Sequence, residues 1–290
     1  MKNIRVFLVL LVFLTGAISQ ETQAQSAVPS IPIDGAFQRT DYLKRKPTPL
    51  PYIREADVMW SKKVWRIIDL REKMNQPMYY PTTEVEGKNN LVNLFLAGIK
   101  DGKLTAYDAK NDDEWKIPMS YDQVKESFGA VAKTRKVRDP DTGEWKDAPV
   151  TGEIRSEEIK QIMLKEEWYF DKQTSTLNVR ILGICPIREY FRDEDVNQES
   201  PQRQKVFWIY YPEARELLAA NEVFNPQNTA RNSSYDDIFL KRIFSSYILK
   251  ESNIYNNREI SQYLGGKDAM LESKRIESDI FDYEQNLWEY

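Results

Sequence analysis

The 290-residue sequence contains no histidine. Histidine is the side chain most often used as a general base, and it is a frequent ligand of zinc, copper and iron. Its absence excludes catalytic triads that use histidine, HExxH zinc sites and the iron site built from two histidines and a carboxylate. Chemistry based on paired carboxylates, on lysine or on calcium held by oxygen atoms stays open.

The sequence has one cysteine, Cys185. A single cysteine cannot form an internal disulfide, so the chain must be stabilised by its core, to which contacts with partners can add. Cys185 lies in the apolar stretch Gly183-Ile-Cys-Pro186, and there is no histidine to activate it. A buried structural thiol is therefore favoured over a nucleophile.

An excess of positive charge is also absent. Lysine and arginine total 41 against 45 aspartates and glutamates, and the two signs are mixed along the chain. Proteins that bind nucleic acid usually carry a basic excess or a basic stripe, so we expect no nucleic-acid partner. The run Asn111-Asp-Asp-Glu114 lacks the alternating oxygens and the glycine of an EF-hand, and we interpret it as a solvated loop. The sequence shows no glycine-rich phosphate loop and no metal-ligand cluster, so we assign no catalytic residue, cofactor or metal.

The longest apolar run, Val6 to Leu14, follows Lys2 and Arg5 and precedes small and polar residues that end at Ala24. This layout predicts a secretory signal peptide over residues 1–24. The run is shorter than the roughly 20 apolar residues of a transmembrane helix, which favours export over anchoring. A bacterial lipoprotein would need a cysteine directly after the signal, so we expect no lipid on this N-terminus.

A proline-rich segment, residues 25–52, follows the signal. Its prolines are Pro29, Pro32, Pro47, Pro49 and Pro51. We expect an extended arm with polyproline character. Two interpretations stay open: a disordered leader, or an arm that lies over a neighbouring subunit. The rest of the chain, residues 53–290, is expected to form one domain, with a sub-boundary near 131–150. There the turn chemistry of Pro140-Asp-Thr-Gly143 predicts either a hairpin or an ordered excursion over residues 131–148.

β-favouring residues dominate two stretches of this domain. Residues 168–184 predict a hairpin around a polar turn at 171–176, and residues 205–211 predict a further strand whose aromatic side chains alternate between its two faces. Both faces of the sheet should therefore be covered. The predicted fold class is α+β, with a central, mostly antiparallel sheet packed by amphipathic helices and an extended N-terminal arm.

Apolar residues at the helical period predict the helices. They are expected at 57–75, 90–99, from 120 onward, 156–167, 212–220, 236–253 and 267–288. The segments 57–75 and 236–253 match at a fixed offset, which raises the hypothesis of a duplicated helical unit.

Several side chains suggest contact surfaces. On the helix predicted at 57–75, Trp65 projects toward the polar side, where it either packs under another element or joins an interface, and packing is favoured for a large aromatic. Arg71 falls on the apolar side, so its charge must be paired, reach solvent or meet a partner. The last helix carries a second apolar stripe, and aromatic residues continue to the end of the chain. The interface candidates are Trp65, Arg71, Met270, Phe281, Trp288 and Tyr290.

Five blocks of sequence carry a resemblance to a known family. They are Val64-Trp-Arg-Ile-Ile-Asp-Leu-Arg-Glu-Lys-Met-Asn75, Gly183-Ile-Cys-Pro-Ile187, Phe207-Trp-Ile-Tyr-Tyr-Pro212, Phe244-Ser-Ser-Tyr-Ile-Leu-Lys-Glu-Ser-Asn253 and Leu287-Trp-Glu-Tyr290. With these blocks in this order, the sequence resembles the GldN/PorN family, periplasmic components of the Bacteroidetes type IX secretion and gliding-motility machinery.

The resemblance implies a non-enzymatic subunit of a periplasmic ring beneath the outer membrane. It implies binding to a lipoprotein of the GldK/PorK type, contact with the periplasmic part of the GldM/PorM motor protein and self-association in the ring. The chain would then be held at the outer membrane through its lipoprotein partner. The alternative is a periplasmic glycan-binding protein, or one that processes glycans with carboxylates, because such carboxylates can lie far apart in sequence.

Overall fold

The computed structural model describes residues 45–85, 87–110, 113–130, 133–138, 145–150, 152, 154–191, 201–224 and 233–288. The predicted signal peptide, residues 25–44 of the predicted arm, and Tyr290 lie outside these ranges. Within the described ranges, none of the helices is long and apolar enough to cross a membrane.

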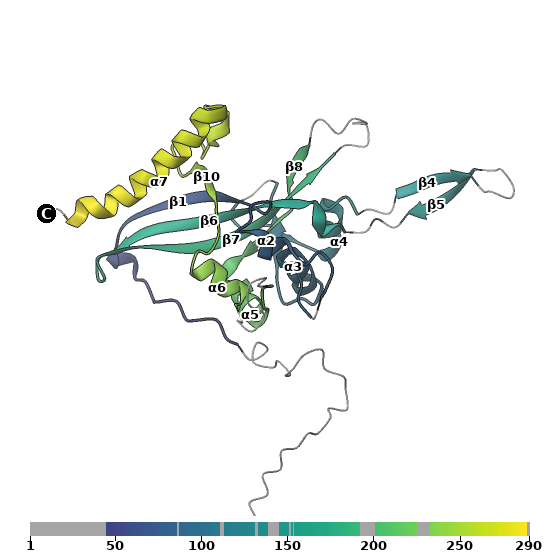
Figure 1. Ribbon diagram of the computed structural model, residues 1–290, viewed down its shortest axis with the longest axis horizontal. Helices are drawn as coiled ribbons and strands as arrows, with labels where there is room; N and C mark the ends of the chain where they lie inside the picture. The colour runs from purple at the N-terminus through teal and green to yellow at the C-terminus, as the bar shows by residue number, and fades with distance from the viewer. Residues whose placement is uncertain are drawn as a thin grey trace, which may run out of the picture. The chain divides into compact units, whose positions relative to one another are not determined.

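The centre of the fold is an antiparallel sheet (Figure 1). Its strands are β1 (Val58–Asp69), β2 (Ala106–Asp108), β3 (Pro118–Met119), β6 (Ile159–Asp171), β7 (Thr176–Tyr190), β8 (Gln202–Lys205), β9 (Phe207–Tyr210) and β10 (Tyr247–Glu251). They follow one another in the order β10-β1-β6-β7-β9-β2-β3, and β8 pairs with β7 off this path. A separate two-stranded sheet is made by β4 (Lys133–Arg138) and β5 (Trp145–Val150). The predicted fold class is confirmed, and so are both predicted hairpins.

Several helices begin at capping residues that the sequence supplies. Asn90 accepts a hydrogen bond from the backbone N–H of Asn93, and Ser120 forms a reciprocal capping box with Gln123, as expected for a helix start at residue 120. The helices are α2 (Gln76–Tyr79), α3 (Leu91–Lys100), α4 (Tyr121–Ser127), α5 (Tyr211–Ala220), α6 (Tyr235–Leu240) and α7 (Gly266–Trp288). Three short 3₁₀ turns are η2 (Glu55–Asp57), η3 (Ser156–Glu158) and η4 (Ile260–Gln262).

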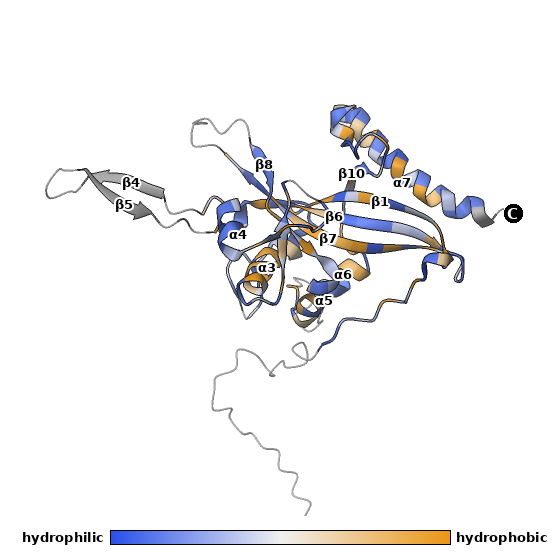
Figure 2. Cartoon of the chain, turned by 180° about the vertical axis from the view of Figure 1, so that it is seen from behind, coloured by the Kyte–Doolittle hydropathy of each residue, from blue (hydrophilic) through white to orange (hydrophobic). Residues whose placement is uncertain are grey.

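One face of the sheet carries two apolar clusters. The larger cluster joins residues such as Ile68, Leu164 and Phe207 to the buried sides of α3, α5 and α6, and α3 is coloured mostly as hydrophobic in Figure 2. The smaller cluster joins Val64 and Trp168 to α7, which runs beside β10 in Figure 1. Since side chains alternate along a strand, Val64, Arg66 and Ile68 point to this same face. Arg66 therefore lies between the two clusters.

The opposite face carries a third cluster that includes Trp65, Met163, Cys185 and Trp208. The half-buried Trp115, from the connection between β2 and β3, packs against this cluster. In β9, Phe207 and Ile209 lie in the first cluster while Trp208 lies in the third. This confirms the prediction that both faces of this strand are covered.

Three predicted helices are wrong. Residues 57–75 form β1 and a following turn, and residues 156–167 form η3 and the first part of β6. Every residue from Val64 to Ile68 is buried. A strand covered on both faces has a continuous apolar run, which cannot be told from a helix by its period.

The third wrong helix is 236–253. In this segment α6 ends at Leu240, and β10 begins at Tyr247. Arg242 adopts a left-handed backbone conformation with φ of 52°, which stops the helix. The hypothesis of a duplicated helical unit is wrong as well, because the first copy is a strand.

Candidate interaction surface

Two buried charges of opposite sign lie side by side on the sheet. Arg66 is 5% exposed and Glu166 is fully buried. In the register of β1 with β6, Arg66 is opposite Leu164 and Val64 is opposite Glu166. Because residues directly opposite each other point to the same face of a sheet, both charged side chains lie on one face. This face is the one that carries the helices, and the charges therefore separate the cluster under α3, α5 and α6 from the cluster under α7.

The Glu166 carboxylate is fully hydrogen-bonded. Arg242 donates from Nη1 to Oε1 at 2.8 Å and from Nη2 to Oε2 at 3.3 Å, and the indole Nε1 of Trp168 donates to Oε2 at 3.1 Å. The guanidinium of Arg242 also lies 5.3 Å from the Trp168 ring centroid. The left-handed conformation of Arg242 places its side chain in this position. A bidentate pair of this kind compensates the burial of the carboxylate.

The guanidinium of Arg66 is held by two elements. Its Nε donates to Ser246 Oγ at 3.1 Å, and its Nη2 pairs with Glu277 of α7. Burial lowers the pKa of Arg66, although the charges of Glu166 and Glu277 act in the opposite direction. Because arginine does not lose its proton in proteins, this burial is a free-energy penalty that further negative charge would reduce.

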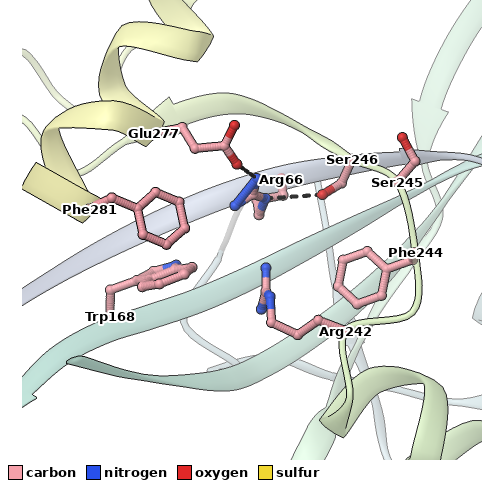
Figure 3. Close-up of a pocket in the computed structure, with 8 residues that line it drawn as sticks. All are labelled: Arg66, Trp168, Arg242, Phe244, Ser245, Ser246, Glu277 and Phe281. Carbon is pink, nitrogen blue, oxygen red and sulfur yellow. Dashed lines mark hydrogen bonds and ion pairs between the residues drawn. The ribbon is translucent and has the colours of Figure 1, made fainter. Parts of the chain in front are cut away.

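These side chains line a groove of about 270 Å³, shown in Figure 3. Its lining residues are Arg66, Trp168, Arg242, Phe244, Ser245, Ser246, Glu277 and Phe281. We call it the arginine groove. One wall is α7, the other is the connection between α6 and β10, and the floor is β1 and β6.

Aromatic rings give the arginine groove its apolar part. Phe281 on α7 is 50% exposed and meets the buried Trp168 edge-on, with 5.8 Å between ring centroids. On the other wall, Phe244 is buried and lies 5.2 Å from the Arg242 guanidinium. The arginine groove thus combines two cations with partly exposed apolar surface, a composition common at protein interfaces.

The C-terminal helix α7 is docked on the sheet by one side only. Its Ile276 and Ile280 are buried, its Ser273 Oγ accepts a hydrogen bond from the backbone N–H of Ile248 at 2.9 Å, and its Glu284 accepts one from the backbone N–H of Leu177 at 3.1 Å. Met270 is 72% exposed, and Leu271 is exposed as well. Large apolar side chains on the free side of a docked helix are typical of a contact surface.

The structure places the six sequence-predicted interface candidates in different surroundings. Phe281 lines the arginine groove, and Met270 is exposed on the same helix. Trp288 is in α7, but its side chain lies outside the described part, as does all of Tyr290. Trp65 is buried on the opposite face, with the Nζ atoms of Lys250 and Lys165 at 4.4 and 5.4 Å from its ring centroid. The packing alternative for Trp65 is the one that the structure bears out.

Arg71 is also separate from the arginine groove. It follows the end of β1, is exposed, and forms a bidentate pair with Asp69, with Nη2 to Oδ2 at 2.6 Å. This hydrogen bonding raises the pKa of Arg71 and lowers that of Asp69. Of the three outcomes considered for its charge, two are observed together: the guanidinium is paired with a carboxylate and reaches solvent.

The end of the proline-rich arm contacts its own chain. Arg215 Nη2 donates to the carbonyl oxygen of Thr48 at 2.6 Å, and Arg180 donates to that of Pro51. Arg45 pairs with Asp237 at 3.2 Å. At least these residues of the predicted arm therefore pack on the domain that follows them, while residues 25–44 lie outside the described residues.

The prediction that Asn111 to Glu114 is a solvated loop is wrong for Asp113. Its carboxylate accepts hydrogen bonds from Lys250 Nζ at 2.8 Å and Trp208 Nε1 at 3.2 Å, and its carbonyl oxygen accepts one from Lys165 Nζ at 2.5 Å. It anchors the β2–β3 connection on the face of the sheet that carries Trp65. Asn111 and Asp112 lie outside the described residues.

The carboxylates and the thiol described here are engaged in ion pairs or buried. Both carboxylates of the arginine groove are paired with arginine, and Cys185 is completely buried with a pKa raised by that burial. Among the described residues, no group of three or more histidine, cysteine, aspartate and glutamate side chains could hold a metal ion. The arginine groove thus combines two paired arginines with partly exposed aromatic surface.

The chain belongs to the family of gliding motility associated proteins GldN, whose family model matches residues 53–289. The match begins where the predicted arm gives way to the folded domain and ends near the C-terminus of the chain. A comparison with curated proteins gives no match.

Proposed function

We propose that this protein is a non-enzymatic structural subunit of a periplasmic ring complex in the type IX protein secretion and gliding-motility apparatus. In this role it binds a lipoprotein of the GldK/PorK type and couples it to the periplasmic domain of a GldM/PorM motor protein. It associates with further copies of itself in the ring, and the lipoprotein holds it at the outer membrane.

Two features of the sequence support the proposal. Membership of the GldN family connects the chain to gliding motility. The first 24 residues have the layout of a secretory signal peptide, which agrees with a periplasmic location.

The observation that carries the proposal is the free side of α7. Met270 and Leu271 are exposed there, although the other side of the same helix is packed on the sheet. A second exposed apolar pair, Ile254 and Tyr255, follows β10. Closed rings require two different patches on each subunit that fit each other, and these two surfaces are candidates for them.

A glycan-processing site would need converging acids with room for a sugar between them. In the arginine groove, Glu166 and Glu277 are each bound to an arginine, and the volume of about 270 Å³ lies below the usual range of small-molecule sites. The groove therefore favours protein contact over glycan chemistry.

Light scattering of the mature protein, residues 25–290, tests the proposed function. The protein is measured alone, with the soluble domain of the lipoprotein partner, and with the periplasmic domain of the motor protein. Large complexes of defined mass that form only in the mixtures are the expected result. A protein that stays monomeric and binds neither domain would contradict the proposal. Glycan binding and hydrolysis would then be measured.

A further inference from the structure

We propose that the arginine groove binds an acidic side chain of a partner protein, whose carboxylate replaces Glu277 on Arg66 while a neighbouring apolar side chain packs against Phe281. This inference rests on the proposed function, because it specifies what the partner presents to this surface.

The hydrogen-bond donors of the arginine groove are only partly used. Among the described residues, the Nη1 of Arg66 and the Nε of Arg242 have no hydrogen-bond partner. Ser246 accepts from Arg66 and lines the same groove, so its hydroxyl proton remains available as a donor. A carboxylate that enters the groove would therefore meet donors from two guanidinium groups and one hydroxyl.

The two glutamates differ in how firmly they are held. Glu166 is completely buried and uses both oxygens on Arg242 and Trp168, so it is a fixed part of the site. The Glu277 side chain is 34% exposed, extends from α7, and has Arg66 as its one hydrogen-bond partner among the described residues. Glu277 can therefore turn into solvent without leaving a buried carboxylate unpaired.

The charges of the arginine groove favour a ligand group with a single negative charge. Arg66 and Arg242 are matched by Glu166 and Glu277, so the four side chains have no net formal charge. Replacement of Glu277 by another carboxylate keeps this balance, whereas a phosphate dianion would add an excess of negative charge. The small volume of the groove suits one or two side chains better than a free metabolite.

The apolar wall explains why the ligand is a protein segment. The half-exposed Phe281 lies against the edge of Trp168 beside the two cations. An aliphatic or aromatic residue next to the acidic one would cover this ring and exclude water from the ion pair. Charge-assisted hydrogen bonds are stronger in such water-poor surroundings.

Substitution of Ser246 gives a matched pair of variants. In Ser246→Asp the chain supplies its own carboxylate to Arg66 and fills the groove from within, and Ser246→Asn has nearly the same size without the charge. With the partner domains used above, the dissociation constant should rise at least about tenfold for the aspartate variant and stay within about threefold of wild type for the asparagine variant. Thermal unfolding checks that both variants are folded.

The variant Glu277→Gln should bind the partner more tightly than wild type and yet be less stable. It removes the internal competitor, so partner binding should tighten by about threefold to tenfold, although the unfolding midpoint falls because Arg66 loses its counter-charge. A purely structural ion pair would give weaker or unchanged binding.

These measurements separate a failure of the arginine-groove proposal from a failure of the proposed function. If wild-type protein binds a partner domain but Ser246→Asp binds as tightly as Ser246→Asn, or if Glu277→Gln does not tighten binding, the role of the arginine groove is overturned and the proposed function stands. If wild-type protein binds neither domain, both proposals fall.

Discussion

The rings of Trp60 in β1 and Tyr283 in α7 are stacked, with 4.6 Å between their centroids and 21° between their planes. Phe170 of β6 meets Tyr283 edge-on at 6.4 Å. These aromatic contacts attach the C-terminal part of α7 to the sheet beyond the buried Ile276 and Ile280. They thereby help to fix the position of Phe281 at the arginine groove.

Replacement of Tyr283 by alanine should loosen the last turns of α7. We expect the free energy of unfolding to fall by about 1–2 kcal/mol, because an aromatic pair and its buried area are lost. Urea unfolding measures the loss, and faster amide hydrogen exchange in residues 277–288 locates it. Tyr283→Phe keeps the ring and should stay within about 0.5 kcal/mol of wild type. Equal losses in the two variants would mean that the stacked ring is not what holds the helix.

Gly183 in β7 provides the space that Trp115 occupies. A Cβ atom at residue 183 would lie 2.7 Å from Cζ2 of Trp115 and 3.2 Å from the carbonyl oxygen of Ile209. Gly183→Ala should therefore destabilise the protein by about 1–3 kcal/mol through overpacking. In a background of Trp115→Ala the same substitution should cost clearly less, because the ring is gone. Chemical denaturation of the four proteins measures the difference, and a cost that is the same in both backgrounds would show that the indole is not the obstacle.

Removing one member of the buried pair of Glu166 and Arg242 should destabilise the protein more than removing both. Arg242→Met leaves a fully buried carboxylate without its main partner and should destabilise the protein by about 3–5 kcal/mol. The double variant with Glu166→Met removes both charges and should recover part of this loss. Urea unfolding of the two single variants and the double variant tests the coupling. Additive losses would indicate that the two side chains act independently.

The acid sensitivity of the fold should depend on Asp113. Burial by itself would raise the pKa of this carboxyl, but the hydrogen bond and the charge of Lys250 outweigh burial and lower it. A carboxyl with a lowered folded pKa stabilises the protein above its unfolded pKa of about 4, and the stabilisation is lost as the pH falls through the folded pKa. With no histidine to titrate, the free energy of unfolding should be nearly flat from about pH 7 to 5 and fall below about pH 4.

The control for this prediction is Asp113→Asn. It should be less stable than wild type at pH 7, because Lys165 and Lys250 lose their counter-charge, and its stability should decrease less steeply between about pH 4 and 2. Tryptophan fluorescence during urea unfolding reports both quantities. A variant with the wild-type pH slope would assign the acid sensitivity to other carboxylates, such as Asp69, whose pKa is lowered by Arg71.

Sequence reasoning predicted elements that have one exposed side. The hairpin of β6 and β7 has a polar turn, α7 has a clear apolar stripe, and α4 begins at a capping residue. It failed for β1, the first part of β6 and the segment from α6 to β10. In β1 the run from Val64 to Ile68 is buried on both faces, so the period that separates helix from strand is missing from this stretch.

The arginine groove was not predicted from the sequence, because its residues come from distant segments of the chain. Phe281 stood out as an apolar residue off the main stripe of its helix. Arg66 and Arg242 did not, because their proximity depends on the register of β1 with β6 and on the left-handed turn after α6. A local signal for Arg66 exists once β1 is taken as a strand, since an arginine between Val64 and Ile68 then points to the face that packs on helices.

Cys185 offers a test of how firmly the second face of the sheet is closed. The thiol is completely buried and its pKa is raised by that burial, so it is both inaccessible and protonated at neutral pH. A thiol reagent should therefore label the native protein many times more slowly than the unfolded protein. The labelling rate should rise with urea in parallel with global unfolding, because the buried thiol is exposed only when the sheet opens.

Rapid labelling without urea would instead show local opening, and the first candidate is the connection held over this face by Asp113 and Trp115. In that case Asp113→Asn should accelerate labelling further, whereas a thiol closed in by the whole sheet should respond to this substitution only through global stability.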